Sequence, residues 1–173
     1  ATGRQGEAQL LLESMSDADL QAMGGIDNLR ATLSYEDAQR SIKAGDANSA
    51  VAALEDTIAY NPRYPWARLE LARIRLKQGQ AAQADALIRP LELDPQAPDE
   101  SVYAAALYYS EKSDYTKVDQ LLRRIPDQRL TKEQAKLLGN AMRYIVDVPG
   151  LQDQLRAGPS LIPAMLEEVL RLE

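Results

Sequence analysis

Three alanines, Ala38, Ala72 and Ala106, stand 34 residues apart in this chain. Turn and apolar residues recur around them at the same interval: Gly45, Gly79 and Ser113; Leu54, Ile88 and Leu122; Tyr35, Leu69 and Tyr103. A unit that repeats its apolar positions at this length predicts a series of paired helices. Each pair is too small to bury its apolar face alone, so neighbouring pairs must pack against one another.

The small residues and the turn residues indicate how each helix pair is built. Antiparallel helices approach most closely at a small side chain, which is the structural role we expect for Ala38, Ala72 and Ala106. Gly45 suits the left-handed residue that ends a helix, whereas Pro62 cannot continue one. A period of 34 is that of the tetratricopeptide repeat. The predicted fold class is therefore all-α, a right-handed superhelical solenoid of helix-turn-helix repeats.

The pattern predicts three parts along the chain. Residues 1–30 would hold the end of a preceding repeat and an irregular inserted helix, residues 31–126 three repeats, and residues 127–173 a degenerate repeat and a terminal helix. In the first complete repeat, the first helix is expected at residues 34–44. Because the pattern begins within a repeat, we expect the natural protein to extend further toward its N-terminus.

Two helices are predicted in the C-terminal part. Thr131 and Gln134 have the spacing of a capping box, in which the two residues exchange hydrogen bonds at a helix start. A turn is expected at residues 149–150. Apolar residues on one stripe of residues 160–172 then predict an amphipathic helix. This helix either covers the open end of the array or begins a repeat that continues further.

Composition narrows the functional classes. The chain has 20 Lys and Arg against 26 Asp and Glu, and its net charge of −6 disfavours nucleic acid and anionic membrane surfaces as partners. It has no Cys and no His, which removes the commonest zinc ligands, the thiol nucleophile and the usual general base. No stretch approaches the ~20 apolar residues that span a bilayer. We expect a protein that is not an enzyme, with no catalytic residue, no metal site and no cofactor.

The first helix of each pair is expected to line a concave groove, where such arrays hold their partners. The predicted partner-binding residues are those near the small alanines: Tyr35, Gln39, Trp66, Leu69, Arg73, Lys77 and Tyr103, with Lys43, Leu107 and Glu111 at further groove positions. An aromatic face beside Arg73 suits stacking on a peptide or a sugar ring.

An alternative interpretation of the aromatic residues stays open. Tyr35, Trp66 and Tyr103 would then fill gaps between helices and bind nothing. Packing is the expected role of a second set of aromatic residues, Tyr60, Tyr108, Tyr109, Tyr115 and Tyr144.

Two segments carry a resemblance to a known family. In the first, Pro65 and Trp66 precede the helix Arg-Leu-Glu-Leu-Ala-Arg of residues 68–73; the second is the junction Arg-Ile-Pro-Asp-Gln-Arg-Leu-Thr of residues 124–131. Over residues 31–146 the chain resembles the periplasmic repeats of the outer-membrane cellulose export proteins of the bacterial cellulose synthase system. The resemblance implies a periplasmic scaffold within an outer-membrane-anchored protein, joined outside this sequence to the pore through which the glucan leaves the cell.

This resemblance implies a function in cellulose synthesis and export across the outer membrane. The chain would be a scaffold for protein-protein interactions, and its partners would be other proteins of the polysaccharide synthesis and export complex. Two alternatives stay open: a glucan-binding track along the row Tyr35, Trp66 and Tyr103, and a generic repeat adaptor without an export role. Direct membrane insertion by this segment and nucleic-acid binding are not expected.

Overall fold

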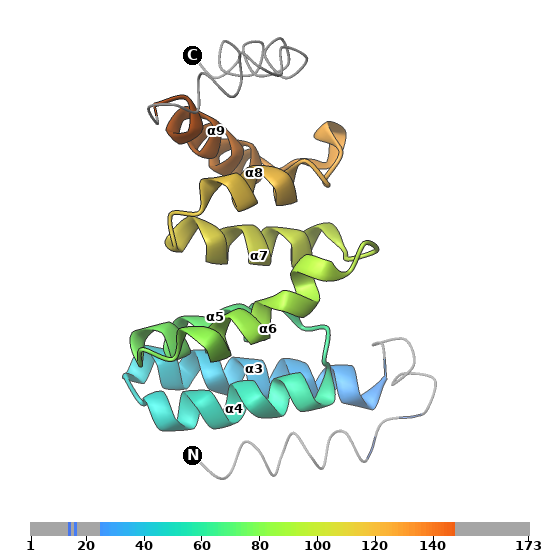
Figure 1. Ribbon diagram of the computed structural model, residues 1–173. Coiled ribbons are helices and arrows are strands. Elements are labelled where there is room, and N and C mark those ends of the chain that lie inside the picture. Colours follow the sequence, from blue (N-terminus) through green and yellow to red (C-terminus); the bar gives the residue numbers. More distant parts are fainter. Residues whose placement is uncertain (1–13, 15, 17–24, 148–173) are drawn as a thin grey trace. The chain divides into compact units, whose positions relative to one another are not determined.

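A computed structural model of the chain describes residues 14, 16 and 25–147. These residues contain seven α-helices, one 3-10 helix and no strand, which confirms the all-α fold class for the described part of the chain. The α-helices, labelled as in Figure 1, are α3 (Ile26–Ala44), α4 (Ala47–Tyr60), α5 (Pro65–Lys77), α6 (Ala81–Leu93), α7 (Asp99–Glu111), α8 (Tyr115–Leu122) and α9 (Lys132–Asp147). The 3-10 helix η1 (Asp127–Arg129) lies between α8 and α9.

The chain divides into two compact units, residues 1–79 and residues 80–173. In the first unit, α3 packs against α4 and α4 packs against α5. In the second unit, α6 packs against α7, α7 against α8 and α8 against α9. Within each unit, therefore, a helix packs on its neighbour in the chain, as in repeat arrays. The division of the sequence at residues 30 and 126 stays a prediction.

Residues that recur every 34 positions form the core of both units. The side chains of Ala38, Ala72 and Ala106 are 0% exposed, which confirms their predicted packing role. Two further sets with the same spacing are also fully buried: Ala50, Ala84 and Val118, and Leu54, Ile88 and Leu122. A larger side chain at the alanines would have to displace a neighbouring helix, because the interior is close-packed.

Each turn predicted from the repeat contains a residue with left-handed backbone conformation. The φ angle is +75° at Gly45 and at Gly79, and +59° at Ser113. At the first turn, the N–H of Gly45 donates to the carbonyl of Ile42 at 3.1 Å, and the N–H of Asp46 donates to that of Ser41 at 3.0 Å. This pair of bonds is the Schellman arrangement, which satisfies the last carbonyls of a helix.

The third turn has the same arrangement and shows how closely the paired helices are joined. The N–H groups of Ser113 and Asp114 donate to the carbonyls of Ser110 and Tyr109 at 3.0 and 2.9 Å. The carboxylate of Asp114 then accepts from the N–H of Lys117 at 3.2 Å and caps α8. A single aspartate therefore closes one helix and starts the next.

Asp46 has the same two roles at the start of α4. Its carboxylate accepts from the hydroxyl of Ser49 at 2.6 Å and from the N–H of Ser49 at 3.1 Å. These two bonds, the hydroxyl bond foremost, hold the pKa of Asp46 below its ordinary value. Asp46 is thus ionised at neutral pH, the form that best stabilises a helix N-terminus.

The start of α3 corrects one prediction. This helix begins at Ile26, eight residues before the expected residue 34, so the prediction of its start is wrong. Gly25, with φ of +92°, precedes the helix. The two added turns include Asn28, whose side-chain oxygen accepts from the side-chain amide of Asn61 at 3.1 Å. The repeat pattern of the later helices, which begin at Pro65 and Asp99, gives no sign of this extension.

The predicted start of α9 is confirmed. The N–H of Thr131 donates to the side-chain oxygen of Gln134 at 2.8 Å, and the N–H of Gln134 donates to the hydroxyl of Thr131 at 3.3 Å. This exchange is a capping box. The turn at residues 149–150, the helix over residues 160–172 and the preceding repeat near the N-terminus lie outside the described residues.

The junction that follows α8 is tied back to the end of α6. The guanidinium of Arg124 donates to the carbonyl of Glu92 at 2.8 Å and also to the carbonyl of Asp94. In addition, Arg129 forms an ion pair with Asp99 at 3.4 Å. Two arginines of the junction motif therefore hold chain segments about 30 residues earlier, and Arg124 satisfies carbonyls at the end of α6.

Ser113 offers a test of the turn. Replacing Ser113 by Gly should raise the free energy of unfolding by about 1 kcal/mol, because a side chain is disfavoured in the left-handed region. Chemical denaturation measures this change. The matched variant Ser110→Gly, in the last turn of α7, should lower the free energy of unfolding by about 0.5 kcal/mol, because glycine weakens a helix more than serine does. Equal effects of the two variants would contradict the assignment of the turn.

Candidate partner-binding site

Three of the predicted groove residues come together in the first unit. Tyr35, on α3, forms a hydrogen bond with the side chain of Gln39 one turn later. Its ring lies 5.0 Å from the ring of Tyr64 at the start of α5, with an angle of 42° between the ring planes. On α5, Arg73 pairs with Glu70 at 2.6 Å, and both charges act on the Tyr35 hydroxyl. We call these five half-buried residues the first-unit cluster.

Burial, followed by the negative charge of Glu70, raises the pKa of Tyr35 to about 12. The hydrogen bond from Gln39 and the charge of Arg73 act in the opposite direction but are smaller. Tyr35 is consequently neutral at physiological pH. The cluster thus presents a neutral hydroxyl, an amide, an aromatic pair and a half-exposed ion pair. These are groups that can exchange hydrogen bonds with a polypeptide and cover its apolar side chains.

The other predicted groove residues have different environments. Trp66, in the first turn of α5, is half-buried, and Lys77 at the end of α5 is exposed. Leu69 is only 1% exposed, so its side chain belongs to the core. Tyr103 is half-buried on α7 in the second unit, where burial and then the charge of Glu133 raise its pKa. A groove that continues from the first-unit cluster to Tyr103 stays a prediction.

The second unit contains a network of tyrosines and charged residues that the sequence did not reveal. The hydroxyl of Tyr108 on α7 donates to Oδ1 of Asp85 on α6 at 2.6 Å. The ammonium of Lys112 donates to the same oxygen at 2.6 Å and lies 5.2 Å from the centre of the Tyr108 ring. Asp85 is thereby held by two donors that follow it by 23 and 27 positions.

Glu92, two turns after Asp85 on α6, has equivalent partners. The hydroxyl of Tyr109 donates to Oε2 of Glu92 at 2.6 Å, and Lys117 of α8 donates to Oε1 at 2.8 Å. Lys117 also donates to the Tyr109 hydroxyl at 3.0 Å and lies 4.2 Å from the centre of that ring. The two tyrosine rings meet edge to face at 5.4 Å. We call the six residues the tyrosine-carboxylate network; it links α6 to α7 and α8.

The pKa shifts in this network follow from its hydrogen bonds. The bonds from Lys112 and then Tyr108 hold the pKa of Asp85 below its ordinary value. For Glu92, burial alone would raise the pKa, but the bonds from Lys117 and Tyr109 outweigh burial and lower it. The bond to Glu92 in turn raises the pKa of Lys117. Both carboxylates and Lys117 are therefore charged at neutral pH.

The tyrosines that were expected to pack between helices have mixed outcomes. Tyr108 and Tyr109 are buried, which confirms their packing role, while Tyr115 is half-buried. The prediction is wrong for Tyr60, which is 41% exposed and has the guanidinium carbon of Arg30 5.8 Å from its ring centre. The side chain of Tyr144 lies outside the described part of the structure.

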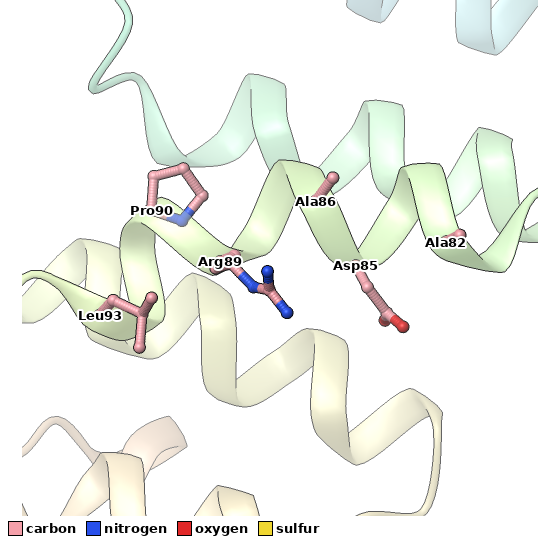
Figure 2. Close-up of a pocket in the computed structure, with 6 residues that line it drawn as sticks. All are labelled: Ala82, Asp85, Ala86, Arg89, Pro90 and Leu93. Atoms are coloured by element: carbon pink, nitrogen blue, oxygen red, sulfur yellow. The ribbon is translucent and has the colours of Figure 1, made fainter.

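Two clefts lie along α6. One has a volume of about 490 Å³ and is lined by Ala82, Asp85, Ala86, Arg89, Pro90 and Leu93 (Figure 2). The other, of about 380 Å³, lies over the tyrosine-carboxylate network and is also lined by Arg89 and Leu93. The first cleft is mostly apolar, whereas the second contains acidic and basic groups that already bind one another.

Within the part of the chain that the structure describes, the His, Cys, Asp and Glu residues form no cluster that could hold a metal ion. No helix within residues 25–147 is both long and apolar enough to cross a membrane.

The helix pairs, the left-handed turns and the alanines buried at their contacts define a tetratricopeptide repeat fold. Comparison with protein families agrees, because residues 41–108 match the family described as Tetratricopeptide repeat. Domains of this kind are typically non-catalytic and hold other proteins.

Two curated proteins share similarity with most of this chain. Both are named Cellulose synthase operon protein C. The protein of Pseudomonas fluorescens (strain SBW25) is 29% identical over 137 residues, which cover 79% of this chain and 11% of that protein. The protein of Xanthomonas axonopodis pv. citri (strain 306) is 31% identical over 139 residues, which cover 80% of this chain and 9% of that protein. The chain thus spans about a tenth of the length of these relatives.

The shifted pKa of Glu92 predicts an acid-sensitive step in unfolding. The pKa of Glu92 is lower in the folded state than its ordinary value of 4.5, so the ionised carboxylate stabilises the fold at pH values above 4.5. This stabilisation is lost as the pH falls through the pKa that Glu92 has in the folded state. Glu92→Gln should lower the free energy of unfolding at pH 7 by roughly 1 kcal/mol and make its decline below pH 4.5 shallower.

Chemical denaturation at a series of pH values measures both effects. The matched variant Glu133→Gln replaces an exposed glutamate of the same unit and should change the free energy of unfolding by no more than a few tenths of a kcal/mol. An unchanged pH profile in Glu92→Gln would refute the role given to Glu92.

Proposed function

We propose that this chain is a non-catalytic part of a periplasmic scaffold that binds other proteins in cellulose synthesis and export across the outer membrane. The observation that carries the proposal is the coincidence of two findings: tetratricopeptide repeats, and similarity over about four fifths of the chain to proteins named Cellulose synthase operon protein C. The partners would be other proteins of the synthesis and export complex, and the scaffold would belong to an outer-membrane-anchored protein.

The first-unit cluster supports binding of a protein segment. Tyr35 can donate and accept hydrogen bonds while its ring covers an apolar side chain. Arg73 is half-exposed and paired with Glu70 on the same helix, so an incoming carboxylate could share its guanidinium. Gln39 adds an amide that can pair with a peptide backbone. This arrangement favours a polypeptide partner over a small charged ligand, because the cluster contains both charges.

Replacing Arg73 tests the proposed site. Immobilised chain should bind purified components of a bacterial cellulose synthesis complex, and Arg73→Gln should weaken that binding at least about tenfold, because a charge-assisted hydrogen bond is lost. Surface plasmon resonance measures the affinities, and circular dichroism checks that each variant is folded.

A matched control is available on α3. Arg40 pairs with Asp37 three residues before it, as Arg73 pairs with Glu70, and lies outside the cluster. Arg40→Gln removes the same charge and should change the affinity by less than about twofold. If wild-type chain binds no component, the proposed function fails. If binding persists in Arg73→Gln, the function stands and the assignment of the site is wrong.

A glucan-binding surface is the second candidate, favoured by the half-buried rings of Tyr35 and Tyr64 and by the half-buried Trp66 in the first turn of α5. Aromatic faces stack on sugar rings, at on the order of 1 kcal/mol for each ring. Titration of the chain with cello-oligosaccharides should change the fluorescence of Trp66, the single Trp in the sequence. Tyr35→Phe should preserve this response, while Tyr35→Ala should reduce it. A flat titration of wild-type chain would exclude this candidate.

A further inference from the structure

The helix α6 has two opposite faces. Its buried face consists of Ala84, Ile88 and Leu91, whose exposures are 0%, 0% and 5%. The opposite face, which we call the outer face of α6, consists of five exposed residues: Ala82, Ala86, Arg89, Pro90 and Leu93. The last four of these residues follow Ala82 by four, seven, eight and eleven positions. At those spacings all five fall within about one third of the helix circumference, so they share one side of α6. They line the cleft of about 490 Å³.

The outer face is unusually apolar for an exposed helix surface. Leu93 is 67% exposed, and among the described residues only Leu93 and Tyr60 are large hydrophobic residues with such exposure. Pro90 lies inside the helix and has no N–H, so the carbonyl of Ala86 lacks the donor that a helix normally supplies. The Pro90 ring therefore adds apolar surface to this face of the helix.

Arg89 supplies a positive charge at the edge of this face. Within the described residues its guanidinium forms no hydrogen bond and no salt bridge, although its charge helps to lower the pKa of Glu92. The neighbouring carboxylates of Asp85 and Glu92 are already bound by Lys112 and Lys117. Figure 2 shows the side chains of Arg89 and Asp85 extending away from α6. An available cation therefore lies beside an apolar face, on a chain whose net charge is −6.

We propose that the outer face of α6 docks a polypeptide segment of a partner protein in which acidic residues stand beside apolar ones. A carboxylate of the segment binds the guanidinium of Arg89, which presents a fork of donors that fits two oxygens. Apolar side chains of the segment cover Pro90 and Leu93. This surface lies on the second helix of a repeat, so it goes beyond the first-helix groove of the proposed function.

Two labelled peptides of equal length test the proposal. They contain the same Leu and Ala residues and differ only in carrying Glu or Lys between them. Fluorescence anisotropy measures binding to the whole chain, and amide chemical shifts locate the peptide. The Glu peptide should bind and shift the amides of residues 86–93. Arg89→Glu should weaken its binding about tenfold and allow the Lys peptide to bind. Leu93→Gln should weaken the binding of the Glu peptide.

Lys132→Glu is the matched control, because it makes the same change in net charge at an exposed position on α9. It should leave the binding of the Glu peptide within about twofold of wild type. The proposal is overturned if the Glu peptide does not bind, if Lys132→Glu weakens it as much as Arg89→Glu, or if the shifted amides lie elsewhere. Sedimentation velocity gives one more outcome. If the wild-type chain dimerises, Leu93→Gln abolishes the dimer and the Glu peptide does not bind, the surface would be assigned to a second copy of the chain. That result would overturn the peptide proposal.

Discussion

Reversal of the chain within two or three residues is the constraint on which the helix pairs of this structure depend. A residue with left-handed backbone lies in each turn, at Gly45, Gly79 and Ser113. Without it, the last N–H groups of the turn could not reach back to the carbonyls of the preceding helix. In two of the turns the next residue is an aspartate that caps the following helix. The short turns also bring small side chains such as Ala38 against the paired helix, where Ala38 is fully buried.

Features fixed by local chemistry and by periodicity could be predicted from the sequence. The alanines at intervals of 34, the left-handed turns and the capping box at Thr131 and Gln134 are all present where the pattern places them. Each depends on a residue type with one strong physical preference: a small side chain, positive φ or a short polar cap. Even Ser113, which disfavours the required backbone, takes the position that the period assigns to it.

Contacts between residues far apart in the sequence could not be predicted in this way. Asp85 and Tyr108 belong to different helices, and neither carries a local signal that identifies its partner. The early part of α3 is bound, through Asn28, to Asn61 at the far end of the next helix. For the candidate site, periodicity brought Tyr35, Gln39 and Arg73 into one cluster but also included Leu69, which is buried. Periodicity predicts on which face of a helix a residue lies. Whether that face is buried depends on the packing of the neighbouring helices, which periodicity does not predict.

The lengths of the connections reveal a division between rigid and variable parts of the repeat. Within pairs, the connections are residues 45–46, 78–80 and 112–114, whereas between pairs they are residues 61–64, 94–98 and 123–131. Only the second group varies widely, because every residue of the short turns has a defined hydrogen-bonding role. An added peptide, such as an epitope for an antibody, would therefore disrupt a helix pair if placed after residue 45. Between pairs, the same insertion would leave the paired helices intact.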